Sequence, residues 1–590
     1  MKQYKKYAAP YWYAFILGPI LMLVEVAGEV LMPKLLANII NVGINYQGGE
    51  ATGKGISYIV SMGGGMIALA LVMMVGGIGG AFFAFTAATN FANDLRKDLF
   101  FKVQSFSFAN VDRFSTGSLV TRLTNDVTQL QNLIAEGLRM LLRAPGMLIG
   151  ALIMAITMNA RLALVVLCVI PVLVLVVGIV MKLAFPRFTG MQKQLDRVNS
   201  NIQENLTNVR VVKSFTRENY EQEGFARENS ALRDRAVSAM KLMITLLPIV
   251  TFIMNFTTLS IVWFGGKQVL NTTMEVGDLT AFINYVEQIL MSLMMLSMVL
   301  LNSSRAMASS DRIMEILNTE VDLTDENAKH KDLLVKEGKI EFSHVYFKYY
   351  KDNEEWVLSD LNFTVEPGQT LGIIGSTGSG KTSLVSLIPR LYDVDQGPNG
   401  EGKVLVDGVD VRDYSLKNLR SQIAMVLQKN ILFSGTIEEN LLWGNESASH
   451  EEVEEVAKAA RAHDFIQGFP QGYDTELGQG GVNVSGGQKQ RLCIARALLN
   501  QPKILILDDS TSAVDTATEA RIRESFHKEL AGTTKIIIAQ RISSVEDADK
   551  ILVLDDGKIA GIGSSQELLQ TCKAYAEIYD SQIDRKKGLA

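Results

Sequence analysis

The segment at residues 375–382 constrains the fold of this chain more than any other stretch. It fits the pattern of glycine, four residues, glycine, lysine and a hydroxyl residue, in the order Gly375, Ser376, Thr377, Gly378, Ser379, Gly380, Lys381 and Thr382. An apolar run at 371–374 precedes it and a helical run beginning at Ser383 follows it, so it is predicted to join a buried strand to a helix. Glycines let the backbone turn so that N–H groups point at phosphate oxygens, and the helix N-terminus strengthens this attraction. The alternative is a Gly/Ser loop that binds no ligand, and it does not explain why Lys381 and Thr382 follow the glycines.

Side chains in and near this segment predict nucleotide chemistry. Lys381 is placed to reach the outer phosphates of a nucleotide, and the Thr382 hydroxyl is placed to hold Mg²⁺. A second apolar run at 504–508 ends in the carboxylate of Asp508, which suits a metal ligand beside the phosphate loop. The sequence therefore predicts that the chain binds a nucleoside triphosphate together with Mg²⁺.

Composition divides the 590 residues into two different halves. Hydrophobic residues make up 48% of the chain and charged residues 20%, with a mean hydropathy of +0.16. Apolar runs fill the region before about residue 301, whereas strands alternate with helices from residue 340 onward. The formal charge of −6 argues against a nucleic-acid partner, and the three cysteines lack metal or redox spacing.

Six apolar spans precede residue 302, each near or above the roughly 20 residues needed to cross a bilayer. They lie near residues 11–37, 56–88, 134–158, 162–185, 242–264 and 279–301. We therefore predict a membrane α-helical domain of six transmembrane helices at 1–301, a linker at 302–339, and a cytoplasmic α/β P-loop nucleotide-binding domain at 340–590.

The connections between the spans alternate in length and predict the orientation. Those after the first, third and fifth spans are short, whereas those after the second and fourth are long, helical and rich in Lys and Arg. Positively charged loops stay on the inner side of a membrane. We therefore place both long extensions, both termini and the nucleotide half in the cytoplasm, with the chain as a multi-pass protein of the cytoplasmic membrane.

Two spans carry candidates for contact with a substrate. Glu25 and Glu29 lie four residues apart on one face of the first span, and carboxylates inside a membrane are costly enough to be functional candidates. The alternative places them in water near the outer mouth, or in pairs with neighbouring helices. In the sixth span Glu287 is followed by Met291 and Met294; such a stripe usually packs, and a soft lining for apolar ligands is the second interpretation.

A second glycine-rich motif lies between the phosphate loop and the run at 504–508, and it consists of Ser485, Gly486, Gly487 and Gln488. Together with the six spans, it resembles the signature motif of ATP-binding cassette (ABC) transporters, and the whole chain resembles a half-transporter of the ABC exporter type. The resemblance implies that ATP is bound between two cassettes, with the phosphate loop of one facing the signature of the other. One chain then carries half of each of two sites, and it must pair with a second ABC half-transporter.

Further motifs follow in the order that the family implies. Tyr349 matches the aromatic residue that stacks on adenine, and Gln428 matches the glutamine that touches both Mg²⁺ and the membrane domain. Residues 512–515 resemble the loop that contacts the opposite subunit. Residues 110–114 and 211–215 resemble the two coupling helices of the membrane domain.

Two positions depart from the family pattern. Asp509 stands where the family usually has glutamate, which polarises the attacking water, and Gln540 stands where it usually has histidine, which contacts the γ-phosphate. Aspartate is one methylene shorter, and a misplacement of about 1 Å can cost on the order of a hundredfold in rate. Glutamine cannot become cationic. We therefore predict that both are degenerate catalytic residues in a site that binds Mg-ATP and hydrolyses it poorly; neutral drift in a working homodimer is the alternative.

The resemblance implies ATP-driven export, with drugs or other hydrophobic or amphipathic small molecules as substrates. Heterodimers with one degenerate site are common among bacterial multidrug exporters, so the chain is predicted to be the degenerate-site subunit of such a bacterial pair. Its signature motif would complete the competent site of the partner. A lipid or peptide exporter, a homodimeric pump and a membrane-bound ATP-sensing subunit remain as alternatives.

Overall fold

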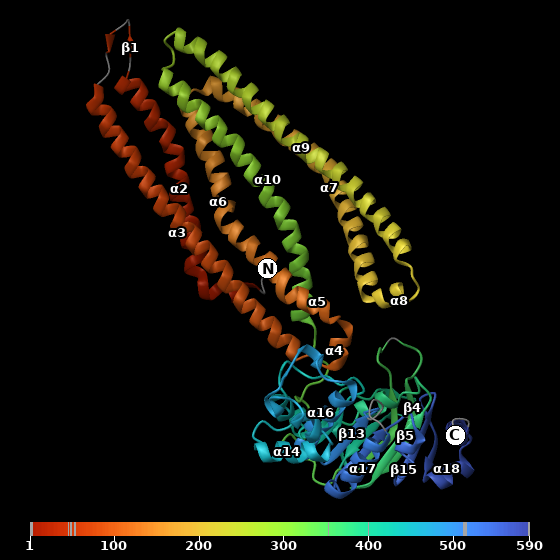
Figure 1. The fold of residues 1–590 in the computed structure, drawn as a ribbon. Coiled ribbons are helices and arrows are strands. Elements are labelled where there is room, and N and C mark those ends of the chain that lie inside the picture. The colour runs from red at the N-terminus through yellow and green to blue at the C-terminus, as the bar shows by residue number, and fades with distance from the viewer. Residues whose placement is uncertain are drawn as a thin grey trace. The chain divides into compact units, whose positions relative to one another are not determined.

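The computed structural model describes residues 4–44, 46–47, 50–51, 55–351, 353–398, 400–510 and 516–587. The chain divides into two compact units (Figure 1). The helical unit comprises Met1–Gln104 and Thr116–Asn318, and the α/β unit comprises Ser105–Ser115 and Thr319–Ala590. A short segment between two long helices of the helical unit thus belongs to the α/β unit.

Six helices of the described residues are long and apolar enough to cross a membrane, which confirms the predicted spans. The helices of the helical unit are α1 (Lys5–Ala8), α2 (Trp12–Asn38), α3 (Gly55–Gln104), α5 (Thr116–Thr121), α6 (Val127–Met158), α7 (Ala160–Thr207), α8 (Val209–Ser214), α9 (Glu218–Leu270) and α10 (Val276–Asn318). Two short strands, β1 (Tyr46–Gln47) and β2 (Glu50–Ala51), pair between α2 and α3. Helices α3, α7 and α9 reach about 50 residues because polar, helix-forming sequence continues each apolar span.

Within the helical unit, α2, α3, α6 and α10 pack together, while α7 and α9 lie side by side as a pair (Figure 1). The approach of α2 to α3 depends on glycine. A β-carbon at Gly76 would lie 2.9 Å from the carbonyl oxygen of Leu21, and one at Gly80 would lie 3.1 Å from that of Gly18. Small residues at these positions let the two backbones meet, as in other membrane helix pairs.

The α/β unit is built on a six-stranded sheet in the order β10-β13-β14-β5-β15-β16. The first five strands are parallel and the last is antiparallel. Their bounds are β10 (Ile423–Val426), β13 (Ile504–Asp508), β14 (Thr534–Ile538), β5 (Thr370–Gly375), β15 (Lys550–Asp555) and β16 (Lys558–Gly563). The central strands are runs of apolar residues with nearly every side chain buried, as parallel strands covered on both faces require.

A second sheet of four antiparallel strands, in the order β4-β3-β8-β9, completes the core of this unit. Its strands are β3 (Ile340–Phe347), β4 (Leu358–Val365), β8 (Lys403–Val406) and β9 (Val409–Asp410). Side chains of both sheets share one buried cluster, in which the rings of Phe342 and Phe363 stack at 4.5 Å across β3 and β4. Short two-stranded pairs are formed by β6 (Gln396–Gly397) with β7 (Gly400–Glu401) and by β11 (Gly435–Thr436) with β12 (Glu476–Leu477).

Helices surround the two sheets of the α/β unit and carry its motifs. They are α4 (Phe108–Arg113), α11 (Lys381–Ser386), α12 (Leu416–Arg420), α13 (Ile437–Leu442), α14 (His450–Ala459), α15 (His463–Gln467), α16 (Gly486–Leu499), α17 (Thr516–Glu529), α18 (Ser565–Thr571) and α19 (Lys573–Lys587). Side chains from α13 to α17 form a second buried cluster against β10 and β13. Capping boxes begin α4, α13, α14, α16 and α18, so in each helix the N–H groups of the N-cap and of the third helical residue are bonded locally.

The segment that follows α10, residues 319–339, is hydrogen-bonded to the rest of the α/β unit. The predicted linker at 302–339 divides at the end of α10, because 302–318 continue that helix and 319–339 lie in the α/β unit. Backbone N–H groups of four successive residues, 336–339, donate to the carboxylate of Asp407 at 2.7–3.0 Å. The backbone N–H of Leu416 donates to Asp325 at 3.0 Å. Residues 319–339 are therefore an integral part of the α/β unit.

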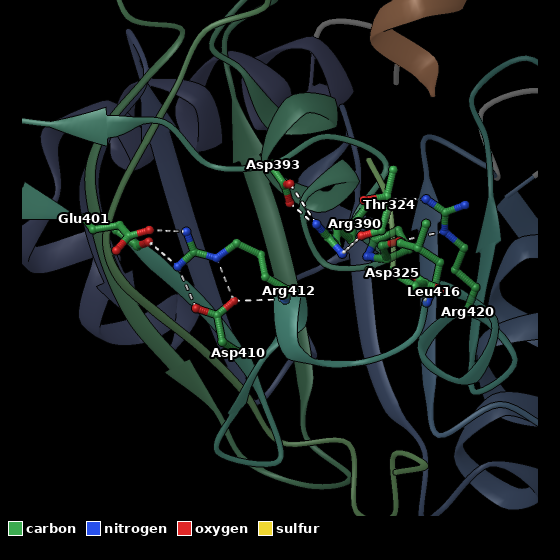
Figure 2. Close-up of polar contacts among 11 residues, drawn as sticks. Thr324, Asp325, Arg390, Asp393, Glu401, Asp410, Arg412, Leu416 and Arg420 are labelled. Carbon is green, nitrogen blue, oxygen red and sulfur yellow. Dashed lines mark hydrogen bonds and ion pairs between the residues drawn. The ribbon is translucent and has the colours of Figure 1, made fainter. Parts of the chain in front are cut away.

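Three arginines, Arg390, Arg412 and Arg420, form polar contacts in the same region of the α/β unit (Figure 2). Arg390 makes two hydrogen bonds to Asp393, at 2.8 and 2.9 Å, and reaches the carbonyl oxygen of Thr324 at 3.5 Å. Arg420 donates to the carbonyl oxygen of Arg390 at 2.6 Å, and Arg412 bonds Asp410 and Glu401 nearby. Paired guanidinium–carboxylate bonds hold two planar groups in one orientation, so the turn at 390–393 is fixed.

Candidate functional site

The predicted phosphate loop connects β5 to α11, as expected. Its turn requires glycine, because Gly378 and Gly380 have φ of 87° and 94°, in the left-handed region. A β-carbon at Gly380 would also lie 2.7 Å from a methyl group of Leu358. Gly380 is the N-cap of α11, so the loop ends where free N–H groups of a helix point outward.

Lys381 folds back over this loop. Its Nζ donates to the carbonyl oxygens of Gly375 and Ser376, at 2.9 and 2.7 Å. Burial lowers the pKa of the Lys381 ammonium, and the charges of Asp508 and Asp509 oppose that shift. The Lys381 ammonium is therefore held over the phosphate loop, near the carboxylates of Asp508 and Asp509.

The carboxyl ends of the parallel strands bring distant residues to the same edge of the sheet. Asp508 ends β13 and is only 2% exposed. Burial raises the pKa of Asp508, with a hydrogen bond from Thr382 opposing the shift. Its Oδ2 atom is buried without a hydrogen-bond partner in the described part of the chain. A buried carboxylate oxygen without a donor, beside a threonine hydroxyl, fits a Mg²⁺ ligand, because hard cations prefer oxygen.

Asp509 and Gln540 meet directly. Nε2 of Gln540 donates to Oδ2 of Asp509 at 2.7 Å. Asp509 has a φ of 48°, and its backbone N–H donates to the carbonyl oxygen of Ile538 at 3.1 Å. Burial raises the pKa of Asp509, and hydrogen bonds from Gln428 and Gln540 oppose the shift. The residues at the two unusual positions are thus bonded to each other within one chain.

Tyr349 lies at the rim of the same site and is 40% exposed. Its hydroxyl is 2.8 Å from the hydroxyl of Ser383 on α11. Its ring meets those of Phe347 and Tyr392 edge to face, at 4.9 and 5.2 Å. These contacts orient an exposed aromatic ring beside the phosphate loop, as a base-stacking residue requires.

A hollow of about 520 Å³ gathers most of the predicted site residues. Those lining it are Tyr349, Gly375, Ser376, Thr377, Gly378, Gly380, Lys381, Thr382, Ser383, Gln428, Asp508, Asp509 and Gln540. Ser379 is buried beneath the loop at 3% exposed. Two further lining residues, Val357 and Ile538, could not be predicted, because an apolar residue at the end of a strand has the same pattern anywhere in a sheet.

The predicted signature motif begins α16 and does not line this hollow in the described chain. Ser485 is the N-cap of the helix, and its hydroxyl accepts from the backbone N–H of Gln488 at 3.3 Å. Oε1 of Gln488 accepts from the backbone N–H of Ser485 at 2.8 Å. Ser485 and Gly486 are exposed. The motif is thus a helix N-terminus open to a ligand that another surface would supply.

Tyr392 is a residue of this region that sequence reasoning missed. Its hydroxyl donates to Oδ2 of Asp112 on α4 at 2.6 Å, and its ring lies 6.1 Å from that of Phe108. Burial, and then the bond to Asp112, raise the pKa of the Tyr392 hydroxyl, so it is a donor at neutral pH. The segment at 110–114, which resembles the first coupling helix, therefore contacts the aromatic cluster that includes Tyr349. The segment at 512–515 lies outside the described residues.

The membrane carboxylates are paired. Arg143 on α6 contacts Glu25 at 3.2 Å and Glu29 at 2.7 Å, and Gln288 on α10 donates to the backbone oxygen of Glu29 at 3.0 Å. The second oxygen of each glutamate is buried without a hydrogen-bond partner in the described structure. Pairing with a neighbouring helix was one of the two interpretations of these residues, and it does not decide whether they also contact a substrate.

The other candidates lie on α10. Glu287 is exposed, Met291 is 50% exposed, and Met294 packs partly buried against the core of the helical unit. An exposed methionine one turn from an exposed carboxylate offers both an adaptable apolar contact and a charge.

Comparison with known proteins covers almost the whole chain. The model of the ABC transporter transmembrane region matches residues 15–293, and that of the ABC transporter domain matches residues 358–512. The ABC transporter ATP-binding protein YfiB of Bacillus subtilis is 40% identical over 99% of both chains. YgaD of the same organism, whose name provisionally assigns it to multidrug export, is 33% identical over 99% of both. The structure of a bacterial Atm1-family ABC exporter with ATP bound has a TM-score of 0.77 and 27% identity, covering 96% of this chain and 98% of that one.

Proposed function

The chain belongs to the ABC transporter family, as a half-transporter of the exporter type, and from this premise we propose that it is the weakly hydrolysing subunit of a heterodimeric exporter. Members of this type are dimers in a membrane and carry an ATP-binding domain, which implies ATPase activity in general. The proposal adds the asymmetry between the two nucleotide sites and the class of substrate.

One contact carries the proposal: the 2.7 Å hydrogen bond between Asp509 and Gln540. Hydrogen bonds from Gln540 and Gln428 hold the Asp509 carboxylate at the site. This carboxylate starts one methylene further back than that of a glutamate, so it is further from a water that would attack the γ-phosphate. Gln540 is neutral, so it stabilises charge developing on a phosphate less than an imidazolium would. Both differences slow the chemical step without removing a group that binds nucleotide.

The binding residues support retention of Mg-ATP at this site. Lys381 and the loop N–H groups would hold the outer phosphates, Tyr349 would stack on adenine, and Thr382, Gln428 and Asp508 would hold Mg²⁺. The bound metal supplies positive charge to the phosphate oxygens. In this role the nucleotide acts as a ligand that stabilises the closed cassettes, because slow hydrolysis lengthens its residence.

The signature motif supports a contribution to a partner's site. Ser485 and Gly486 are exposed at the start of α16, where Ser485 and Gln488 form the capping box. A hydroxyl and free N–H groups at a helix N-terminus attract a γ-phosphate. We assign this motif to a second, competent site whose phosphate loop lies on a different half-transporter.

Drugs or other amphipathic small molecules are the proposed substrates. The name of YgaD points to this class, and Glu25, Glu29, Glu287, Met291 and Met294 are the proposed contacts in this chain. Carboxylates in an apolar setting favour a cationic group, and methionines adapt to apolar bodies of different shape. The proposed location is the cytoplasmic membrane of a bacterium, with both termini in the cytoplasm.

The experiment uses the full-length chain alone in lipid nanodiscs. Its own signature motif is complete, so a homodimer differs from a competent exporter chiefly at Asp509 and Gln540. We expect slow steady-state ATP hydrolysis, and an increase of about tenfold or more in the double variant Asp509→Glu, Gln540→His. The Lys381→Ala variant, which loses the phosphate-directed charge, measures the background. If the unmodified chain hydrolyses ATP as fast as the double variant, the site is competent and the chain is a homodimeric pump.

A further inference from the structure

Gln582, on the C-terminal helix α19, forms hydrogen bonds with the backbone of the segment that carries Gln540. Its side-chain Oε1 accepts a hydrogen bond from the backbone N–H of Ile542 at 2.9 Å. Its Nε2 donates to the backbone carbonyl oxygen of Gln540, also at 2.9 Å. One amide thus holds both ends of residues 540–542, immediately after β14.

Helix α19 is itself fixed to the strand ends of the nucleotide site. Tyr575 on this helix is fully buried, and its hydroxyl lies 2.9 Å from that of Ser565 on α18. Its buried cluster includes Ile374, which precedes the phosphate loop, and Ala539, which precedes Gln540. The buried packing of α19 therefore fixes the position from which the Gln582 amide bonds the backbone beside the nucleotide site.

Gln540 depends on the backbone that Gln582 holds. Its side chain is exposed, and its 2.7 Å bond to Asp509 is the contact that sets its direction. Arg541 has extended geometry, with φ of −104° and ψ of 132°, and a single turn of 3₁₀-helix follows at Ile542–Ser544. The carbonyl oxygens of Arg541 and Ile542 accept from the turn that follows, whereas the N–H of Ile542 and the carbonyl oxygen of Gln540 bond Gln582. Groups at an active site must be held to within about 0.5 Å, so these two bonds are placed to position residue 540.

We propose that Gln582 is a positioning residue for position 540, so that the C-terminal helix sets how well this chain's nucleotide site can hydrolyse ATP. The inference rests on the proposed function in one respect, namely that residue 540 faces the nucleotide. Gln582 touches neither the phosphate loop nor Asp509 through any hydrogen bond described here, and it acts through the backbone of residues 540–542.

A merely structural role makes a different prediction. Water can replace the exposed bond to the Gln540 carbonyl oxygen, whereas the bond from the N–H of Ile542, a residue only 4% exposed, is partly buried. A merely structural role therefore predicts a lower melting temperature and a nearly unchanged rate of hydrolysis by the folded chain. A positioning role also predicts a lower rate of the chemical step in the folded chain, because the direction of the residue 540 side chain would no longer be fixed. Stability and rate therefore separate the two roles.

The test is single-turnover hydrolysis of ATP by the full-length chain in lipid nanodiscs, with enzyme in excess. Gln582→Ala should lower the rate constant by about tenfold and change the ATP affinity by less than about twofold. Gln582→Met, which keeps the length and loses both hydrogen bonds, should match Gln582→Ala. Ser581→Ala is the matched control on the same helix, because among the described residues the Ser581 hydroxyl bonds within α19 alone, and it should match the unmodified chain.

A double-mutant cycle decides the mechanism. In a Gln540→Ala background, where no amide remains to be positioned, adding Gln582→Ala should change the rate constant by less than about twofold. If the two losses multiply instead, or if Gln582→Met keeps the full rate, Gln582 does not act by positioning residue 540. The cycle compares ratios of rate constants, so it tests the role of Gln582 at any absolute rate. A slow site agrees with the proposed function. A fast site contradicts the proposed function and leaves the test of Gln582 intact.

Discussion

Arg143 holds two carboxylates in the apolar part of the helical unit, at 3.2 Å from Glu25 and 2.7 Å from Glu29. One guanidinium balances one of these charges, and in the described part of the chain neither glutamate forms an ion pair with a second cation. Removing one partner would leave a partly buried charge uncompensated, which is costly, so these three side chains link α2 to α6 as a unit. A residual negative charge in a membrane also attracts a cationic group.

Replacement of both carboxylates, Glu25→Gln with Glu29→Gln, is expected to weaken transport of cationic compounds by about tenfold, as a lost contact of about 1.4 kcal/mol would. Transport of neutral compounds should change by less than about twofold. The measurement is uptake of matched cationic and neutral dyes into inverted membrane vesicles. The triple variant that adds Arg143→Gln is the control, because it leaves no unpaired charge. Equal losses for both dyes in both variants would assign the carboxylates to packing alone.

Asp508 and Asp509 are adjacent in the chain and have identical side chains, yet their surroundings suit them to different roles. Asp508 ends β13 with one buried oxygen unsatisfied, whereas the next residue turns into the left-handed region and accepts from Gln540. Burial raises the pKa of both carboxyl groups. The first is arranged for a cation, and the second is bonded to residue 540. The proposed loss of hydrolysis depends on the second, because its side chain is one methylene shorter than a glutamate and its partner is neutral.

At the scale of elements, α4 is the helix whose attachment matters most. It lies between α3 and α5 in the chain, yet it belongs to the α/β unit. Asp112 accepts from Tyr392 at 2.6 Å, and Asn110 donates to the backbone oxygen of Glu320 at 3.1 Å. Tyr392 also touches Tyr349 edge to face. A change at the rim of the nucleotide site can therefore reach α4 through one side chain.

Tyr392→Phe should remove the bond to Asp112 and keep the aromatic contacts. An exposed partner such as Asp112 limits the loss to about 1 kcal/mol, roughly fivefold in the equilibrium for docking α4. We expect ATP affinity within about twofold of the unmodified chain and a several-fold drop in substrate moved per ATP hydrolysed, measured in proteoliposomes of the complete transporter. Tyr350→Phe, on an exposed tyrosine of the same unit, is the control. Strict additivity of Tyr392→Phe with Asp112→Asn would rule out the shared bond as the cause.

The elements that could be predicted from sequence are those whose signal is local. The run at 504–508 is β13 itself, and the glycines and Lys381 marked the loop between β5 and α11. Six apolar spans sufficed for the membrane helices. Contacts between distant residues carried no such signal. Arg143 lies 114 residues from Glu29, and Gln582 lies 42 residues from Gln540; each pair forms only because strand order or helix packing brings its members together.

At the scale of the whole molecule, the proposed function places the two motifs of one chain in different nucleotide sites. Asp509 and Gln540, beside the phosphate loop, are proposed to impair hydrolysis in the chain's own site. The signature at Ser485 is proposed to serve the site of the partner. A substitution in each motif should therefore have unequal effects on a heterodimer, although both motifs contact nucleotide in the same kind of site.

Steady-state ATPase activity of the reconstituted heterodimer tests this asymmetry most directly. Ser485→Arg should reduce it by about a hundredfold or more, because a bulky cation at the start of α16 would block the partner's competent site. Asp509→Asn should cost less than about threefold, since its site contributes little turnover. Ser449→Arg is the matched control, because Ser449 forms the same capping box at the start of α14 and its loss reports the cost of a cap alone. If Asp509→Asn proves as damaging as Ser485→Arg, the two sites are equivalent and the asymmetric assignment is wrong.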